Sequence, residues 1–367
     1  MSTQTAIAPI NAPSPCVAPL PPFAASSGPH DAQVVVVGEA WGEQEAKIGR
    51  PFIGPSGQEL TRLLAEAGFK RSDLLLTNVL AFQPPGNKIE NLCCTKKEAG
   101  EDYPFPAISH GKYLRPQFLP EISRLHEEVS AFPRHLVVAL GNTACWALLG
   151  SSGISSLRGV TANSTLCPGT KVLPTYHPAA ILRQWAWRPI ALADLLKAKR
   201  ESAFPHILRP ERYVLVEPTL AEIEDWIKTH AISAPYLSVD IETRLGQITE
   251  IGFAASRKHA LVIPFVKGFN SDFWPNEGEE YQAWDFVEQL LALPCAKIFQ
   301  NGLYDLTYLA KLGLRVRNAS EDTMLLHHSL YPEMQKSLAF LGSVYTGESS
   351  WKLTYRKARK EELKSDE

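Results

Sequence analysis

Two acidic residues on one apolar segment are the first candidates for chemistry. Asp240 and Glu242 stand two positions apart in YLSVDIET, a run with the composition of a strand. Alternate residues of a strand point to the same side, so both carboxylates are expected on one face. Carboxylates that close repel each other unless a cation neutralises them, and hard oxygen ligands favour Mg²⁺ or Mn²⁺. The pair therefore indicates a divalent-metal site, although Asp-x-Glu alone also occurs by chance in many proteins.

Further polar residues follow this pair along the chain. Asn301 and Asp305 lie four positions apart in QNGLYDLTYL, a spacing that predicts one face of a helix. Asp322 opens the apolar run TMLLHHSL, where a short side chain that caps a helix is expected. The sequence thus predicts two helices here, the second capped by Asp322.

In the first half of the chain, polar residues stand at the ends of apolar runs. Glu39, Asn78 and His177 occupy such positions. In an open α/β sheet, ligands bind beyond the carboxyl ends of the strands. We therefore expect these three side chains to converge on one crevice.

The elements that must position these residues are readable from the same runs. Continuous apolar runs are typical of strands buried on both faces of a parallel sheet. Four such runs occur, at Gln33–Val37, Leu74–Leu80, His135–Leu140 and Lys171–Tyr176. Helices are expected between them: Ser56 and Glu59 predict a capping box, and a second helix begins near Asn142 and stops at Gly150. Alternating strands and helices predict an open α/β sheet.

A second domain is expected after a charged, proline-containing segment. A helix is predicted over 220–230, followed by three strands in YLSVDIET, GQITEIGFAA and HALVIPFV and by helices from Trp284 onward. This succession indicates an antiparallel meander in an α+β or mixed-sheet domain. The expected organisation is a Pro/Ala/Ser-rich tail at 1–31, a first domain at 32–202, a linker at 203–213 and a second domain at 214–367.

Composition limits the class of protein. The 367 residues suffice for two ordinary domains, and 45% hydrophobic with 21% charged residues is globular composition. A net charge of −2 argues against tight non-specific binding of nucleic acid. We expect no membrane segment, because no apolar run reaches the roughly 18 residues that a span needs. The six cysteines include no CxxC pair, so a cytoplasmic setting, in a bacterial or phage-infected cell, is expected.

The motifs of the second half resemble a nuclease family. DIET, QNGLYDLTYL and EDTMLLHHSL, in this order, are similar to the 3′→5′ exonuclease domain of family A DNA polymerases, in the DEDD superfamily. The resemblance implies an RNase H-like mixed α/β domain with two Mg²⁺ or Mn²⁺ ions held by four acids. It assigns Asp240, Glu242 and Asp305 to the first three acids, and Asn301 to an asparagine near the scissile nucleotide.

The fourth acid of that family belongs to a Tyr-x-x-x-Asp motif. Asp366 falls near the expected distance, but Glu362 stands at the tyrosine position. Three interpretations stay open: Asp366 completes the metal site, a partner chain supplies the acid, or the site is inactive. No residues remain for a palm and fingers, so the chain is not expected to be a polymerase by itself.

The first half contains four motifs in order: GEAWGEQE, GRPFIGPSGQEL, TNVL and YHPAAILR. Together they resemble the uracil-DNA glycosylase superfamily, nearest to its bacterial and archaeal iron–sulfur branch. The resemblance implies a three-layer open parallel sheet and a pocket for an extruded base. It assigns Phe52 as an aromatic platform and Asn78 as the amide that reads the uracil edge. His177 would stabilise the departing anion, Glu39 would lie near the sugar or water, and Glu45 matches a further polar position.

Two departures from this family matter. Trp41 fills a proline position, where its indole would either stack on a base or block the pocket. Phe82 stands where the family places a cluster cysteine, and Cys93 and Cys94 are adjacent, so no iron–sulfur cluster is expected.

The resulting hypothesis is a DNA-processing enzyme of replication or repair that combines a uracil-DNA glycosylase-like domain with a metal-dependent 3′→5′ exonuclease domain. Its expected partner is DNA, either single-stranded, with 3′ ends or containing uracil. The alternative is a non-catalytic accessory subunit that binds DNA and docks a separate DNA polymerase chain. A generic nucleotide-binding unit ranks lower, because GxGxxG and the P-loop lysine motif are absent.

Overall fold

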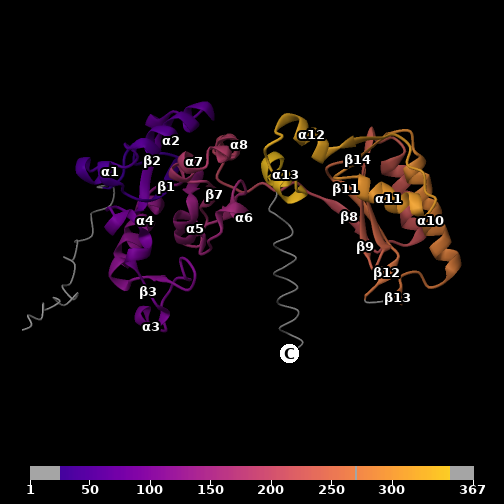
Figure 1. The fold of residues 1–367 in the computed structure, drawn as a ribbon, viewed down its shortest axis with the longest axis horizontal. Coiled ribbons are helices and arrows are strands. Elements are labelled where there is room, and N and C mark those ends of the chain that lie inside the picture. Colours follow the sequence, from indigo (N-terminus) through magenta and orange to yellow (C-terminus); the bar gives the residue numbers. More distant parts are fainter. Residues whose placement is uncertain (1–24, 269–270, 348–367) are drawn as a thin grey trace, which may run out of the picture. The chain divides into compact units, whose positions relative to one another are not determined.

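The computed structural model describes residues 25–268 and 271–347. The chain divides into two compact units (Figure 1): the described residues up to Ile207 together with 342–347 form one, and Leu208–Leu341 form the other. Glu362 and Asp366 lie outside the described residues. None of the helices in the described part has the length and apolar character needed to cross a membrane.

A five-stranded sheet of order β2-β1-β5-β7-β6 forms the centre of the first unit. β1 pairs in parallel with β2 and β5, β5 pairs in parallel with β7, and β6 adds an antiparallel edge. The strands are β1 (Val34–Ala40), β2 (Leu74–Leu80), β5 (Leu136–Leu140), β6 (Ala162–Asn163) and β7 (Lys171–Thr175). The four predicted apolar runs are the four parallel strands, which confirms the expected sheet; the short edge strand β6 was not predicted.

Helices cover both faces of this sheet. α4 and α5 lie against β1, β2 and β5 on one side, while α8 lies against β5 and β7 with α2 and α7 beside it (Figure 1). The α-helices are α1 (Glu43–Ile48), α2 (Pro55–Glu66), α3 (Lys96–Ala99), α4 (Leu119–Ser130), α5 (Gly141–Leu149), α6 (Ile154–Leu157), α7 (Pro178–Arg183) and α8 (Arg188–Glu201). Short 3₁₀ turns add η1 (Arg71–Asp73), η2 (Pro85–Asn87), η3 (Ile89–Leu92), η4 (Pro116–Phe118) and η5 (Trp185–Trp187).

Burial explains why the strands read as unbroken apolar runs. Val34, Val35, Val36 and Val37 are all buried, so β1 has helices on both faces and no solvent side. Leu125 and Val129 of α4 and Trp146 of α5 belong to the core on one face of the sheet. The three-layer α/β prediction is confirmed.

The capping box predicted for α2 is wrong. The helix begins two residues earlier than this box implies, with Gly54 as the N-cap and Pro55 in the first turn, and no side chain caps it. Proline suits this position because its missing N–H would have no partner there. Glu59 instead points inward, where it is 1% exposed and receives a hydrogen bond from Arg188 at 2.8 Å.

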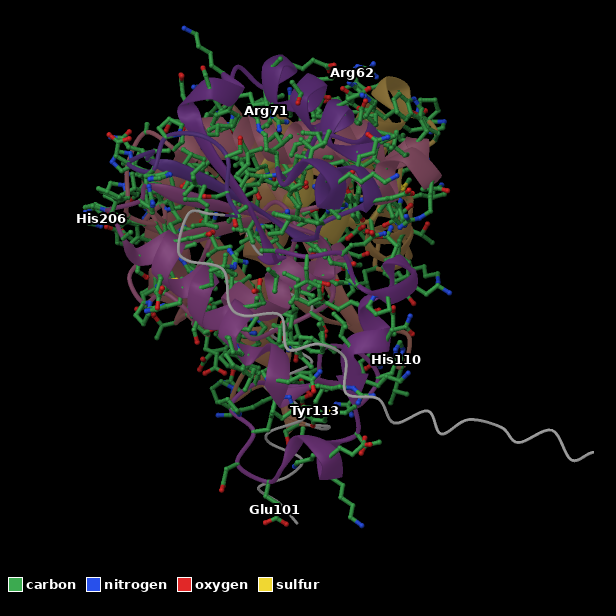
Figure 2. All side chains as sticks on the ribbon, turned by 90° about the vertical axis from the view of Figure 1, so that its left-hand side faces the viewer. Arg62, Arg71, Glu101, His110, Tyr113 and His206 are labelled. Carbon is green, nitrogen blue, oxygen red and sulfur yellow. The ribbon has the colours of Figure 1, made fainter. Side chains whose placement is uncertain are left out.

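A loop-rich excursion follows β2 and carries the two-stranded sheet of β3 (Cys93–Cys94) and β4 (Tyr113–Leu114). It lies at the end of the unit away from α2 (Figure 1), and Glu101 and Tyr113 lie at that end in Figure 2 while Arg62 and Arg71 lie at the other. Leu92, Cys93 and Leu114 join the core of the unit, which anchors the excursion.

A six-stranded mixed sheet of order β15-β14-β9-β10-β11-β8 organises the second unit. β9, β10 and β11 form the predicted antiparallel meander, β14 and β15 extend it in parallel beside β9, and β8 pairs in parallel with β11. Three antiparallel strands extended by parallel strands beside the first is the RNase H-like arrangement, as predicted. The strands are β8 (Tyr213–Val216), β9 (Tyr236–Arg244), β10 (Gln247–Ala254), β11 (His259–Pro264), β14 (Ala296–Phe299) and β15 (Ala319–Asp322), with a hairpin of β12 (Val266–Lys267) and β13 (Ser271–Asp272).

Helices pack around this second sheet. The predicted first helix is shorter than expected, because it changes at Ile227 into a π-helical turn. The helices are α9 (Leu220–Trp226), η6 (Ile227–Ala231), α10 (Glu277–Ala292), α11 (Leu303–Lys311) and α12 (Thr323–Leu330), and α13 (Leu338–Tyr345) spans the boundary between the units in the sequence. Ile223, Val287 and Leu309 meet Phe253 of the sheet in one core, so this unit has a hydrophobic core of its own.

Candidate functional site

A cavity of about 480 Å³ opens at the carboxyl ends of the parallel strands of the first unit. This is the place where open α/β sheets bind ligands. The structure brings five residues singled out from the sequence into its wall: Glu39, Glu45, Phe52, Asn78 and His177. Side chains from four separate segments of chain thus meet at one cavity.

The Phe52 ring and the Asn78 amide are neighbours across Gly38. A Cβ added to Gly38 would lie 2.3 Å from Asn78 Oδ1 and 2.6 Å from Phe52 Cζ, well inside van der Waals contact. Only glycine therefore lets the amide and the ring approach each other here. Phe52 is buried, and its backbone has φ 56°, a left-handed conformation that bulky residues rarely adopt.

Asn78 carries an unusual polar group. Its side chain is 2% exposed, and Oδ1 has no hydrogen-bond partner within the described part of the chain. A buried amide oxygen without a partner costs roughly 1–3 kcal/mol. Because the side chain lines the cavity, a ligand with an N–H group would satisfy it.

His177 follows β7 and caps α7. Its Nδ1 accepts a hydrogen bond from the backbone N–H of Ala179 at 3.1 Å, which leaves Nε2 to carry the ring hydrogen. Burial, with a smaller contribution from the positive charge of Arg183, lowers the pKa of His177 to about 4. The ring centroids of His177 and Phe52 are 6.5 Å apart, so a neutral N–H donor stands near the aromatic ring.

Glu39 lies near the end of β1 and is held by a residue of α5. The hydroxyl of Thr143 donates to Glu39 Oε2 at 2.5 Å, which fixes the carboxylate at the cavity wall. No sequence motif points to Thr143, because its contact depends on the packing of α5 beside β1.

Glu45 has a more structural place than its motif suggests. Its side chain is buried, and Oε1 accepts the backbone N–H groups of Ile53 and Gly54 at 3.0 and 2.9 Å. The carboxylate therefore holds the loop that carries Phe52, while also lining the cavity.

Trp41 does not lie in the cavity wall. It is 9% exposed and packs with Ala25 and Ala81 in a small cluster. In this structure the indole neither stacks over the cavity nor blocks it, because the chain turns it toward the segment before β1.

Other cavity residues were not predicted. Tyr176 and Trp187 stack with centroids 4.6 Å apart and an interplanar angle of 12°, and both line the cavity. Asn142 Oδ1 accepts the N–H groups of Gly153 and Ile154 and so holds the loop at the mouth. Local sequence offers no signal for these pairings, since each joins segments that only the fold brings together.

In the second unit, Asp305 lies on α11 against the strand β9. It is 4% exposed and its Oδ1 accepts the backbone N–H of Ile241 at 3.1 Å. Burial raises the pKa of Asp305 to about 6, and the neighbouring carboxylate of Asp240 adds to the effect. Two of the predicted metal ligands are thus electrostatically coupled.

Asp240 and Glu242 are exposed on β9, alternating with the buried Val239 and Ile241, so they share one face as predicted. Within residues 25–268 and 271–347, however, no three acidic, histidine or cysteine side chains are grouped closely enough to hold one metal ion. Glu242 lies opposite Glu250 on β10, whose pKa is raised by burial and by this neighbour.

The prediction that Asn301 and Asp305 share a helical face is wrong. Asn301 precedes α11 in a left-handed backbone conformation, φ 60°, and its N–H donates to Asp322. Asp322 also accepts the N–H groups of Gly302, Met324 and Leu325. Its predicted role as a helix cap is confirmed, and it ties the start of α11 to that of α12.

The described cysteines do not fit an iron–sulfur cluster. The Phe82 ring packs against Phe118, with 5.6 Å between the ring centroids, and also against the hydrophobic core. A cysteine that binds a cluster from this position would have to point toward the cluster instead. Cys93 and Cys94 are adjacent on β3, and neighbouring side chains of a strand point to opposite sides. Cys16 lies outside the described residues.

The first unit has the fold and cavity of a three-layer α/β ligand-binding protein. A family model, the uracil DNA glycosylase superfamily, matches residues 25–200. The type-4 uracil-DNA glycosylase of Thermotoga maritima is 33% identical over 171 residues, 46% of this chain and 77% of that protein. That of Archaeoglobus fulgidus is 32% identical over 161 residues, 42% of this chain and 69% of that protein. The chain therefore belongs to the uracil DNA glycosylase superfamily.

Solved structures also show local likeness to part of the chain. Escherichia coli RNase D, an exoribonuclease, superposes with a TM-score of 0.29 and 16% identity over 38% of this chain and 34% of that one. The match thus spans about a third of RNase D. The EXD2 exonuclease domain, soaked in Mn and GMP, superposes with a TM-score of 0.25 and 17% identity over 36% of this chain and 68% of that one.

Proposed function

We propose that the chain is a DNA-processing hydrolase whose first unit removes uracil from DNA. The observation that carries this proposal is the Asn78 side chain, which lines the cavity beside the Phe52 ring and whose buried amide oxygen has no partner in the described part of the chain. A primary amide offers one acceptor and one donor group, which matches the N3–H and O4 edge of uracil. The relatives named as type-4 uracil-DNA glycosylases support the same substrate.

The cavity suits a base that has left the helix stack. A glycosylase must extrude its target nucleotide, and an aromatic face compensates for part of the lost stacking. Phe52 supplies such a face next to Asn78, and the Tyr176–Trp187 stack adds a second aromatic wall. Cytosine presents an amino donor where uracil has O4, so the amide orientation that suits uracil would be mismatched to it.

We assign to His177 the role of stabilising the departing base. Hydrolysis breaks the bond between C1′ and N1, and the electron pair leaves with uracil as negative charge on its oxygens. A neutral imidazole whose Nε2–H points at that charge stabilises it without an added proton. Because Nδ1 is occupied by the N–H of Ala179, Nε2 is the atom available for this bond.

We assign to Glu39 the role of stabilising the positive charge that develops on the sugar. As the base leaves, positive charge develops on the sugar, and a carboxylate nearby stabilises it and orients the water whose oxygen forms the new bond to C1′. Thr143 holds the carboxylate for this task. The water proton ends on the uracil anion, so the products are an abasic site and neutral uracil.

The test measures abasic sites by alkaline cleavage of a labelled, uracil-containing oligonucleotide. We expect cleavage with the intact chain and a loss of roughly 100-fold or more with Asn78→Ala or His177→Ala, in line with removing a charge-stabilising donor. Asn163→Ala, an exposed asparagine on β6, is the matched control and should retain activity. Absence of abasic sites with the intact chain, or equal activity in all variants, contradicts the proposal.

A second candidate function is metal-dependent 3′→5′ exonuclease activity in the second unit. It is favoured by the Asp305 carboxylate, whose pKa is raised by burial and, to a smaller extent, by the neighbouring charge of Asp240, since a cation would stabilise both carboxylates in their ionised form. Asp240, Glu242 and Asp305 would hold Mg²⁺ or Mn²⁺, with Asp366 proposed as the fourth ligand. The metal would supply activated water and stabilise the leaving oxygen.

The exonuclease candidate is tested with 3′-labelled single-stranded DNA and RNA in Mg²⁺ or Mn²⁺. Asp240→Ala and Asp305→Ala should abolish nucleotide release, whereas Asp285→Ala, an exposed acid on α10, should not. Equal degradation by all four proteins would indicate a contaminating nuclease. Should neither assay yield product while the native chain co-purifies with a DNA polymerase, the accessory-subunit alternative is favoured.

A further inference from the structure

The loop that carries Phe52 is held in a conformation that its own sequence does not favour. Phe52 has φ 56°, in the left-handed region where an aromatic residue is rare. Such conformations persist only where the surrounding structure over-determines them, and they cluster at functional sites. The contacts that impose this conformation are therefore part of how the aromatic ring reaches the cavity.

One side chain accounts for several of these contacts. Arg71 Nη2 donates to the carbonyl oxygens of Phe52 and Pro51 at 2.9 and 3.4 Å. Its Nη1 donates to Thr61 Oγ1 at 2.7 Å and to the carbonyl oxygen of Gly57 at 3.4 Å. A single planar guanidinium thus joins the Phe52 loop to the first two turns of α2.

The backbone of the Phe52 loop also contacts α2 directly, at Gly57. A Cβ on Gly57 would lie 2.1 Å from the backbone carbonyl of Phe52, so the loop backbone packs directly on the helix. Thr61 Oγ1 donates in turn to the carbonyl of Gly57 at 2.8 Å, which completes a ring of hydrogen bonds around Arg71. Glu45 binds the next two N–H groups of the loop separately.

Arg71 is not among the residues that line the cavity, so it does not touch the base itself. Its planar fork presents several donors in fixed directions, whereas a lysine ammonium is a compact point charge that cannot reach the same four acceptors. The arrangement is thus specific for arginine.

We infer that Arg71 is a positioning residue for base recognition: its guanidinium sets the Phe52 backbone, and thereby holds the aromatic ring against the base next to Asn78. This inference rests on the proposed glycosylase function. Stacking on a preset ring contributes to binding of both the extruded base and the transition state. Loss of Arg71 therefore weakens substrate binding more than it slows the chemical step.

The experiment compares kcat and KM of the full chain on uracil-containing DNA for wild type, Arg71→Met, Arg71→Lys and Arg62→Met. Arg62 is the matched control: its side chain is 69% exposed on α2 and forms an ion pair with Glu59 at 3.5 Å, and Figure 2 shows it apart from Arg71. We expect Arg71→Met to raise KM by roughly 5- to 150-fold, the range that corresponds to loss of base stacking, with kcat within about threefold. Arg71→Lys should lie between Arg71→Met and wild type, and Arg62→Met should match wild type.

Inhibition by free uracil provides a readout independent of DNA binding. The inhibition constant should rise in parallel with KM for Arg71→Met, because uracil alone uses the same ring. A variant that merely lost stability would instead show a lower apparent kcat at unchanged KM and an unchanged inhibition constant, and that result overturns the inference. If Arg71→Met does not fold, Arg71→Lys and Thr61→Val decide the question by the same comparison of KM and the inhibition constant with kcat. An inactive wild type would contradict the proposed function, whereas an active wild type with unshifted variants contradicts only the role of Arg71.

Discussion

At the scale of single residues, the protonation of His177 decides what the cavity can do. The Ala179 N–H occupies Nδ1, and burial with the nearby Arg183 charge disfavours the imidazolium. Both effects keep the ring neutral, as a donor through Nε2. A second proton on the ring would occupy Nδ1, and Nδ1 could then no longer accept the hydrogen bond from Ala179 that caps α7.

The first prediction concerns the titration of His177. The NMR signal of its ring should titrate near pH 4 in the free protein, well below the ordinary value of 6.5. Arg183→Met should move the midpoint upward, because it removes a charge that lowers the pKa. Since the folded pKa is depressed, this histidine contributes stability that is complete above the unfolded value near 6.5. That contribution, at most about 3 kcal/mol, is lost as the pH falls toward 4. A wild-type midpoint near 6.5 would contradict the assignment.

The second prediction concerns Gly38. The substitution Gly38→Ala places a methyl carbon 2.3 Å from Asn78 Oδ1 and 2.6 Å from Phe52 Cζ, so the amide and the ring must move apart. We expect glycosylase activity to fall by at least about tenfold, equivalent to about 1.4 kcal/mol. The same substitution at Gly252, where the added carbon would meet nothing nearer than 3.8 Å, should leave activity intact. Full activity of Gly38→Ala would show that base recognition does not use this approach.

At the scale of elements, each site depends on a helix packed against a strand. α5 brings Thr143 to the end of β1, and α11 brings Asp305 to the middle of β9. In the second case the packing buries a carboxylate beside Asp240. An element arrangement that places like charges together is destabilising by itself and is relieved by protonation or by a cation.

The third prediction follows from the burial of Asp305 and from the charge of Asp240 beside it. Without added metal at pH 7.5, Asp305→Asn should raise the free energy of unfolding of the second unit. The gain is at most about 3 kcal/mol, the free energy that corresponds to the raised pKa of Asp305. The pKa of Asp305 is about 6 in the folded protein and 3.8 ordinarily, so the unfolded chain releases this proton at lower pH. The free energy of unfolding therefore falls as the pH rises from about 3.8 to about 6. Urea unfolding in EDTA measures it, and the gain should vanish at pH 3.5. Asp285→Asn is the exposed control; a less stable Asp305→Asn at pH 7.5 would refute the argument.

At the scale of the whole molecule, each unit has its own sheet and its own hydrophobic core. The described residues of the two candidate sites lie in different units: Asn78 and His177 in the first, Asp240 and Asp305 in the second. Uracil and the metal ion would therefore each bind to one unit. A ligand that binds only the folded state stabilises the unit that holds its site.

The fourth prediction uses this separation. Calorimetry of the full chain should resolve two unfolding transitions, because two cores need not melt together. Free uracil should raise only the midpoint assigned to the first unit, and Mg²⁺ or Mn²⁺ only the other. Asn78→Ala and Asp305→Ala should each remove one of these shifts and leave the other. A single transition that both ligands shift together would contradict independent units.

The sequence by itself determined the four parallel strands of the first sheet, the three-stranded meander of the second and five of the residues that line the cavity. Unbroken apolar runs such as Val34–Val37 report burial on both faces, and alternation in β9 reports burial on one. These patterns are local, so they can be read without a fold, and residues at strand ends such as Asn78 and His177 could be named with them. Tertiary structure alone decided the contacts between distant segments: the Arg71 bonds to the Phe52 loop, the turn of Trp41 away from the cavity, the displacement of Asn301 from α11. The physical reason is that a hydrogen bond or an apolar contact depends on the distance between two groups, and the spacing of residues along a chain does not specify the distance between segments that meet only on folding.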